Sequence, residues 1–268
     1  MRDFVGAVVD TEVPEPMGAY MFGPYEAGSE ICRHVERTVF LEAFGNTPEL
    51  LEQEYGAYER TSVFLCVVDH RRRLPAGAVR LILPEPGGPG LKTLNDLEPV
   101  WGEPADTLLA RAGVAAPRDA SWDVATLAVM PEYRGAAAAG LVSIALYQSG
   151  VRAARRAGVD WMIAILDVVV HRMARLKFQG PFVPFAPARS YLGSAASFPV
   201  YLHISEWERR VAVADPAIHD VMFDARGIEA AVRPLDLARV AALVPASPAS
   251  PAASRRDVPE QEPSHHVA

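Results

Sequence analysis

The residues with the clearest chemical potential lie where a buried strand gives way to a helix. A strand-like run from Trp122 to Met130 ends at Pro131 and is followed by Arg134, Gly135 and a row of small residues, Ala136 to Ala139. A helix start presents unbonded backbone N–H groups and the positive end of the helix dipole, which attract anions. Small side chains let a phosphate approach the main chain, and the arginine adds a charge. The junction therefore predicts a pyrophosphate cradle, although a helix start that binds nothing has the same pattern.

This junction resembles the signature of the GNAT acyltransferase superfamily. The hallmark there is a strand of the kind Leu127-Ala-Val-Met-Pro-Glu-Tyr-Arg-Gly, followed by Arg/Gln-x-x-Gly-x-Gly/Ala at the helix start. Arg134, Ala137 and Ala139 occupy the motif positions, and Ala137 stands where the family usually has glycine. The resemblance implies that acetyl-CoA or a longer acyl-CoA is the co-substrate. The residues implied to bind it are Leu127, Ala128 and Val129 at the thioester, and Arg134, Gly135, Ala136, Ala137, Ala138 and Ala139 at the pyrophosphate.

A second resemblance concerns the first half of the chain. Glu36-Arg-Thr-Val-Phe40, Val67-Val-Asp69 and Gly77-Ala-Val-Arg80-Leu-Ile-Leu are similar to the GNAT branch of acyl-homoserine-lactone synthases and long-chain N-acyl amino acid synthases. The acidic residues that lactone synthases carry after the first helix have no counterpart here. Together the two resemblances cover roughly Glu30 to Trp207.

Transfer of an acyl group from a thioester to an amine also needs groups that move protons. Candidate general bases are Glu36, Asp123 and His171, of which the histidine could equally be a packing residue at a helix start. Many GNAT enzymes use a tyrosine acid on the helix after the fourth strand, where this chain has Met173; Tyr191 remains a candidate donor.

Arg80 has two interpretations, because it could face an acyl acceptor or be the exposed residue of a two-sided strand. We interpret the chain first as an N-acyltransferase that moves an acyl group from acyl-CoA to the amine of a small molecule. The alternative is a catalytically weak GNAT-like module that binds CoA or has a regulatory role. A third interpretation is a purely structural or interaction domain.

The pattern of apolar residues predicts the elements that would position these groups. Apolar residues recur every fourth position between Ser29, a capping residue, and Gly45, a terminating one, which predicts an amphipathic helix. A long helix should follow the junction and end at Gly158. Shorter helices are predicted at 105–112 and 171–178.

Runs rich in β-branched and aromatic residues predict the strands. They lie at 61–69, 76–83, 122–130, 160–166 and 198–207. The first two form a hairpin, and the third and fourth flank the long helix in a βαβ crossover. The predicted fold is therefore α/β with a mixed sheet, a parallel βαβ crossover and flanking helices. The resemblance to GNAT enzymes implies that the rest of the sheet is mainly antiparallel.

Composition divides the chain into four segments. Residues 1–28 contain three prolines and several glycines and are predicted to be an irregular arm. The acyltransferase domain should occupy 29–225, and 226–244 could add a C-terminal helix that Pro234 would interrupt. The Pro/Ala/Ser-rich segment 245–268 has little to bury, which predicts a disordered tail.

Charge and composition exclude several other classes of protein. The 268 residues carry a net charge of −7 and no basic stripe, which argues against a nucleic-acid partner. No apolar run is long enough to span a bilayer, and the N-terminus has no export signal, so we expect a cytoplasmic protein without a membrane partner. The two cysteines, Cys32 and Cys66, have no zinc-site spacing, so we expect free thiols and no metal. A homodimer remains open.

Overall fold

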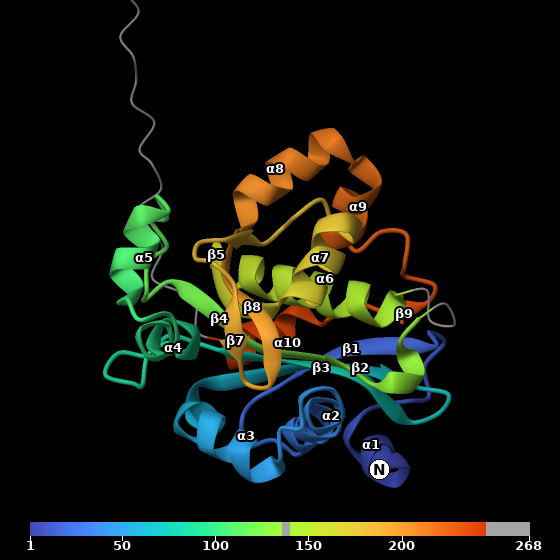
Figure 1. The fold of residues 1–268 in the computed structure, drawn as a ribbon. Coiled ribbons are helices and arrows are strands. Elements are labelled where there is room, and N and C mark those ends of the chain that lie inside the picture. Colours follow the sequence, from blue (N-terminus) through green and yellow to red (C-terminus); the bar gives the residue numbers. More distant parts are fainter. Residues whose placement is uncertain (136–139, 245–268) are drawn as a thin grey trace, which may run out of the picture.

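The structure is a computed structural model that describes residues 1–135 and 140–244 (Figure 1). The cradle residues Ala136, Ala137, Ala138 and Ala139 and the predicted tail, 245–268, lie outside the described residues.

One mixed sheet organises the described part of the chain. Its strands run in the order β6-β8-β5-β4-β3-β2-β1-β9, with β7 paired to β8. Only β1 with β9 and β4 with β5 are parallel pairs, so the predicted mixed, mainly antiparallel sheet is confirmed. The bounds are β1 Met17–Phe22, β2 Ser62–Asp69, β3 Leu74–Ile82, β4 Ser121–Val129, β5 Trp161–Asp167, β6 Val183–Pro184, β7 Arg189–Tyr191, β8 Ser194–His203 and β9 Val232–Arg233.

Helices cover both faces of this sheet. Figure 1 shows α1 (Arg2–Val8), α2 (Ala27–Phe44) and α3 (Pro48–Tyr55) on one face. The other face carries α6 (Leu141–Arg156), α7 (Val168–Lys177), α8 (Ile204–Ala214) and α9 (Pro216–Asp224), with α10 (Leu237–Leu243) against α6. Helix α4 (Lys92–Trp101) packs on β4, β5 and β7, and α5 (Ala105–Arg111) packs on α4.

The apolar side chains of α2 and α6 explain why these helices lie against the sheet. In α2, Ile31 and Val35 are fully buried, and the helix ends at Gly45 in the left-handed conformation, as its sequence predicts. In α6, Val142 and Ala145 are fully buried on the opposite face of the sheet. The two helices therefore seal separate apolar cores above and below the strands.

Residues 1–28 are not the irregular arm that their prolines suggested. They contain α1, and they contain β1, which pairs with β2 along all six of its residues. Backbone hydrogen bonds to β2 and burial under α2 outweigh the weak local strand propensity. The segment 226–244 likewise contributes β9 and α10, so both ends of the described chain complete the sheet.

Two other boundaries differ from the pattern-based ones. The last long strand, predicted at 198–207, is β8 and ends at His203, because Ile204 and Trp207 bury at helical spacing in α8. Helix α4 was missed, since Pro99 lies inside it. Tertiary packing can outweigh the low helix propensity of a proline. Leu97 and Trp101, on either side of Pro99, are buried and provide this packing.

The β4–β5 pair opens into a wedge. The two strands pair only from Ser121 with Trp161 to Asp123 with Ile163, after which β4 continues along β3 and β5 continues along β8. Ala125 is an extra residue in β4 at this point, a β-bulge that bends the strand. We call the space between 124–129 and 164–167 the wedge.

Candidate functional site

A cavity of about 80 Å³ opens on the α2 side of the wedge, and most of its lining is apolar. We call it the polar cavity because it also contains a group of hydrogen-bonding side chains. Its walls come from both strands of the wedge, from α2, and from the turn between β7 and β8. The groups in its lining that can hydrogen-bond through their side chains are Tyr55, Thr126, Asp167, Tyr191, Ser194 and Ser197. The cavity therefore offers several hydrogen-bonding side chains within a largely apolar lining.

An apolar cavity of about 30 Å³ lies on the α6 side. Its lining residues are Val79, Leu81, Val124, Leu127, Leu146, Tyr147, Gly150, Val151, Met162, Phe182 and Leu202, and none of them carries a charge. Val124 and Leu127 line both cavities. The two cavities therefore meet at β4, one polar and one apolar.

Arg80 and Glu36 form a buried ion pair beside the polar cavity. The guanidinium donates from Nε and Nη2 to the two carboxylate oxygens of Glu36, at 3.0 and 2.8 Å, and from Nη1 to Glu59 at 3.0 Å. Burial opposes its charge, but Glu36 outweighs that effect and raises the pKa of Arg80. Glu36 also accepts a hydrogen bond from Thr126, which lines the cavity. The two predicted site residues thus bind each other, so the arginine is a support behind the cavity.

A second ionic cluster supports the wall of the polar cavity that contains Tyr191. Lys92 donates to Glu54 and Asp96, both at 2.6 Å, and the Tyr191 hydroxyl donates to Asp96. Burial, reinforced by nearby acidic groups such as Asp96, raises the pKa of Tyr191 well above its usual value. Tyr191 is consequently a weak proton donor and acts as part of the wall.

Asp123 lies at the start of β4, fully buried beneath α4. Its carboxylate accepts hydrogen bonds from the backbone N–H and the hydroxyl of Thr93, at 2.6 and 2.8 Å. The contacts tie the first turn of α4 to the sheet. Burial raises the pKa of Asp123 to about 7, against the opposing effect of the Thr93 hydrogen bonds.

This pKa predicts a pH-dependent stability difference. Between about pH 4 and about pH 7 native Asp123 keeps a proton that the unfolded chain has lost, so its contribution to stability falls as the pH rises. Asp123→Asn can keep both contacts with Thr93 without ionising. We expect the advantage of the variant over the wild type to grow across this range, reaching about 4 kcal/mol near pH 7. Urea unfolding at several pH values measures it, and a pH-independent difference would contradict the assignment.

His171 lies within α7, one turn after its start. Its Nε2 lies 3.2 Å from the carbonyl of Phe182, and its ring packs on Phe198 with centroids 5.3 Å apart. Met173, at the position of the family's usual tyrosine acid, packs against the core of the α6 side. The structure thus uses His171 for packing and does not place it with the polar cavity residues.

The described part of the predicted cradle contains Arg134, Gly135 and the start of α6. Arg134 donates from Nε to the carbonyl of Val129 at 2.8 Å, and its guanidinium lies 3.7 Å from Glu42. Gly140, in the left-handed conformation, precedes α6, and a Cβ built there would lie 2.8 Å from Nζ of Lys177. Lys177 of α7 therefore brings a cation to this helix start, a contact across elements that the sequence could not indicate.

The predicted thioester residues lie along the wedge edge of β4. Leu127, Ala128 and Val129 are paired with β3 on one side. On the other side, no strand of the described chain pairs with them, because β5 has diverged. Backbone N–H groups on this edge are available to a carbonyl oxygen.

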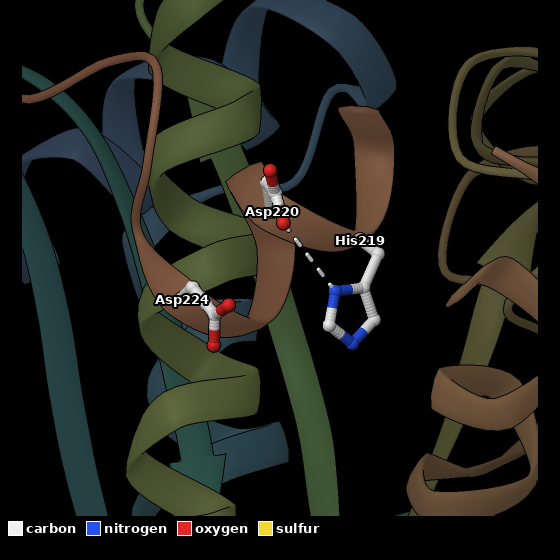
Figure 2. A group of neighbouring side chains, drawn as sticks. All are labelled: His219, Asp220 and Asp224. Carbon is white, nitrogen blue, oxygen red and sulfur yellow. Dashed lines mark ion pairs between the residues drawn. The ribbon is translucent and has the colours of Figure 1, made fainter. Parts of the chain in front are cut away.

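One further cluster has the composition of a metal site. His219, Asp220 and Asp224 offer ligand atoms within 4.8 Å of one another, and Figure 2 shows the Asp220 carboxylate nearest the imidazole. The guanidinium of Arg226 lies 3.9 Å from Asp220 and 3.7 Å from Asp224. Because a cation already faces both carboxylates, we interpret the cluster as a surface ion-pair network.

Comparison with known proteins adds a fold assignment. No family model and no curated protein matches the sequence. Among solved structures, FeeM, an N-acyl amino acid synthase from uncultured soil microbes, is similar at 15% identity with a TM-score of 0.54, over 73% of this chain and 95% of FeeM. BjaI, a CoA-dependent acyl-homoserine lactone synthase with SAM and isopentyl-CoA, is similar at 16% identity and a TM-score of 0.52, over 84% and 98%.

At such identities the similarity establishes the fold. The chain shares the fold of FeeM and BjaI, which confirms the predicted α/β fold with a mixed sheet. None of the helices in the described residues has the length and apolarity that a bilayer crossing requires.

Proposed function

We propose that this protein is an acyltransferase that moves an acyl group from acyl-CoA to the amine of a small molecule. The observation that carries the proposal is the wedge, where a polar and an apolar cavity meet at Val124 and Leu127 of β4. An acyl thioester has a polar reacting carbon and an apolar chain, and an amine acceptor is polar. A site that offers one cavity to each is matched to this reaction.

The residues fit acyl-CoA along the length of the wedge. Among the described residues no atom lies within 4 Å of a Cβ built at Gly135, and Lys177 brings a cation beside Gly140, so the described part of the α6 start offers a positive charge to a pyrophosphate. The free edge of β4 offers N–H groups that would polarise the thioester carbonyl. The acyl chain would then enter the apolar cavity under α6.

Ligand-induced stabilisation tests the donor. A ligand that binds the native state raises the unfolding temperature by mass action, so we expect hexanoyl-CoA to raise it more than acetyl-CoA or CoA. Release of CoA thiol in the presence of amines then tests catalysis. A thermal shift without thiol release would favour a CoA-binding module, an alternative that Met173 at the usual acid position supports. No shift with any thioester would contradict the proposal.

The start of α6 makes a separate prediction. Lys177→Ala should weaken CoA binding roughly tenfold, equal to about 1.4 kcal/mol, because a charge-assisted contact with a phosphate is lost. Isothermal titration with CoA measures the effect. Arg172→Ala removes an exposed cation from the same helix and should leave the dissociation constant unchanged. Equal effects of the two substitutions would indicate a general charge effect and contradict a specific contact.

A further inference from the structure

Asp167 is the last residue of β5 and the N-cap residue of α7. Its Oδ1 accepts a hydrogen bond from the backbone N–H of Val169 at 2.7 Å, which caps the helix. Its Oδ2 accepts the hydroxyl of Ser194 at 2.7 Å. Ser197, opposite Asp167 on β8, in turn donates to Ser194 at 3.0 Å. The carboxylate is thereby fixed in position from two sides.

This carboxylate lines the polar cavity across the wedge from β4. Asp167, Ser194 and Ser197 share the cavity with Thr126 and Leu127. The thioester carbonyl would lie on the β4 side of this space, so a group that prepares an acceptor for attack belongs on the opposite wall. Asp167 is the carboxylate on that wall.

Asp167 retains capacity for a ligand. A carboxylate accepts about four hydrogen bonds, and two are used by Val169 and Ser194. Within the described residues no lysine, arginine or histidine lies at ion-pair distance from it. The acids behind the other walls differ, because Glu36 is paired with Arg80 and Asp96 with Lys92.

We propose that Asp167 binds the ammonium group of the acyl acceptor and removes its proton. This inference rests on the proposed acyl transfer. The ammonium gives one proton to the Asp167 carboxylate, and the neutral amine forms a C–N bond to the thioester carbon. The C–S bond then breaks, the thiolate takes the second proton from the attacking nitrogen, and Asp167 releases the first to solvent. The step needs no tyrosine acid, in agreement with Met173 and with the raised pKa of Tyr191.

Asp167→Asn isolates the charge from the structural contacts. Asparagine caps helices as well as aspartate does, and the Ser194 hydroxyl can turn to accept from the new amide. Asp236→Asn is the matched control, because Asp236 caps α10 through the same contact, to the N–H two residues on, at 2.8 Å. Both variants should bind hexanoyl-CoA as the wild type does, measured by thermal shift.

The readout is release of CoA thiol from hexanoyl-CoA with two kinds of acceptor at neutral pH. A mixture of L-amino acids presents ammonium groups, whereas hydroxylamine is largely neutral and needs no base. Asp167→Asn should lower kcat/KM with the amino acids by about 10²- to 10⁴-fold and change the rate with hydroxylamine only slightly. Asp236→Asn should change neither.

Two results would overturn the assignment of Asp167. The first is an equal loss of kcat/KM with both acceptors, which would show that the residue has only a structural role. The second is wild-type rates in Asp167→Asn. Failure of the proposed function has a different signature, since the wild type would then release thiol with each acceptor no faster than the same mixture without protein.

Discussion

Replacement of Arg80 by alanine is expected to lower the free energy of unfolding by about 3–5 kcal/mol, because it leaves the Glu36 carboxylate buried without its counter-ion. The side chains of both residues are 5% exposed, so water cannot replace the guanidinium. The substitution also removes packing over the rings of Tyr55 and Phe64, whose centroids lie 5.0 and 4.7 Å from the guanidinium carbon. Urea unfolding followed by circular dichroism measures the loss.

Two comparison variants separate the buried charge from other causes. Arg118→Ala breaks an ion pair with Asp106 whose side chains are 51% and 79% exposed, and it should cost less than about 1 kcal/mol. The double variant Arg80→Met, Glu36→Met removes both charges and should recover much of the lost stability. If Arg80→Ala were as mild as Arg118→Ala, the buried pair would not contribute as its geometry indicates.

Substitution of Gly150 by leucine is expected to change the acyl-chain preference by about 100-fold. Gly150 lines the apolar cavity from α6, and a leucine side chain there would occupy the space we assign to the acyl chain. Hexanoyl exceeds acetyl by four methylene groups, each worth about 0.8 kcal/mol when buried, which sums to about 3 kcal/mol. The ratio of kcat/KM for hexanoyl-CoA to that for acetyl-CoA should fall accordingly, while the acetyl-CoA rate stays near that of the wild type.

Gly150→Ala is the matched control for this substitution. A Cβ at Gly150 would lie 3.9 Å from Leu65 and 4.0 Å from Met162, ordinary contact distances. Alanine should therefore stabilise α6 by about 0.5–1 kcal/mol and leave the acyl preference unchanged. An unaltered preference in Gly150→Leu as well would place the acyl chain outside this cavity.

Local patterns predicted most of the elements that build the wedge. The helix from Ser29, the hairpin and the βαβ crossover correspond to α2, to β2 and β3, and to β4, α6 and β5. Each has a strong internal signal, such as helical spacing or a run of β-branched residues. Strand β1 and helix α4 were missed because their conformation depends on partners far along the chain, namely β2 and β4.

The candidate site was less accessible to sequence reasoning. Arg80 and Glu36 were both singled out, but their pairing across α2 and β3 joins residues far apart in sequence, and no local pattern encodes it. Asp167 was overlooked because a single aspartate between a strand and a helix has the signature of a helix cap, which it also is. Only the opposing strand and the Ser194 contact show that the same side chain faces a cavity.

The pairing of β1 with β9 has a consequence for synthesis of the chain. Strand β1 is synthesised long before its outer neighbour, which is formed by Val232 and Arg233. Until those residues leave the ribosome, the sheet has an open edge that could pair with another nascent chain. The long sequence separation of this contact also raises the contact order, which slows the final folding step. Chaperone demand should therefore be greatest before β9 has been synthesised.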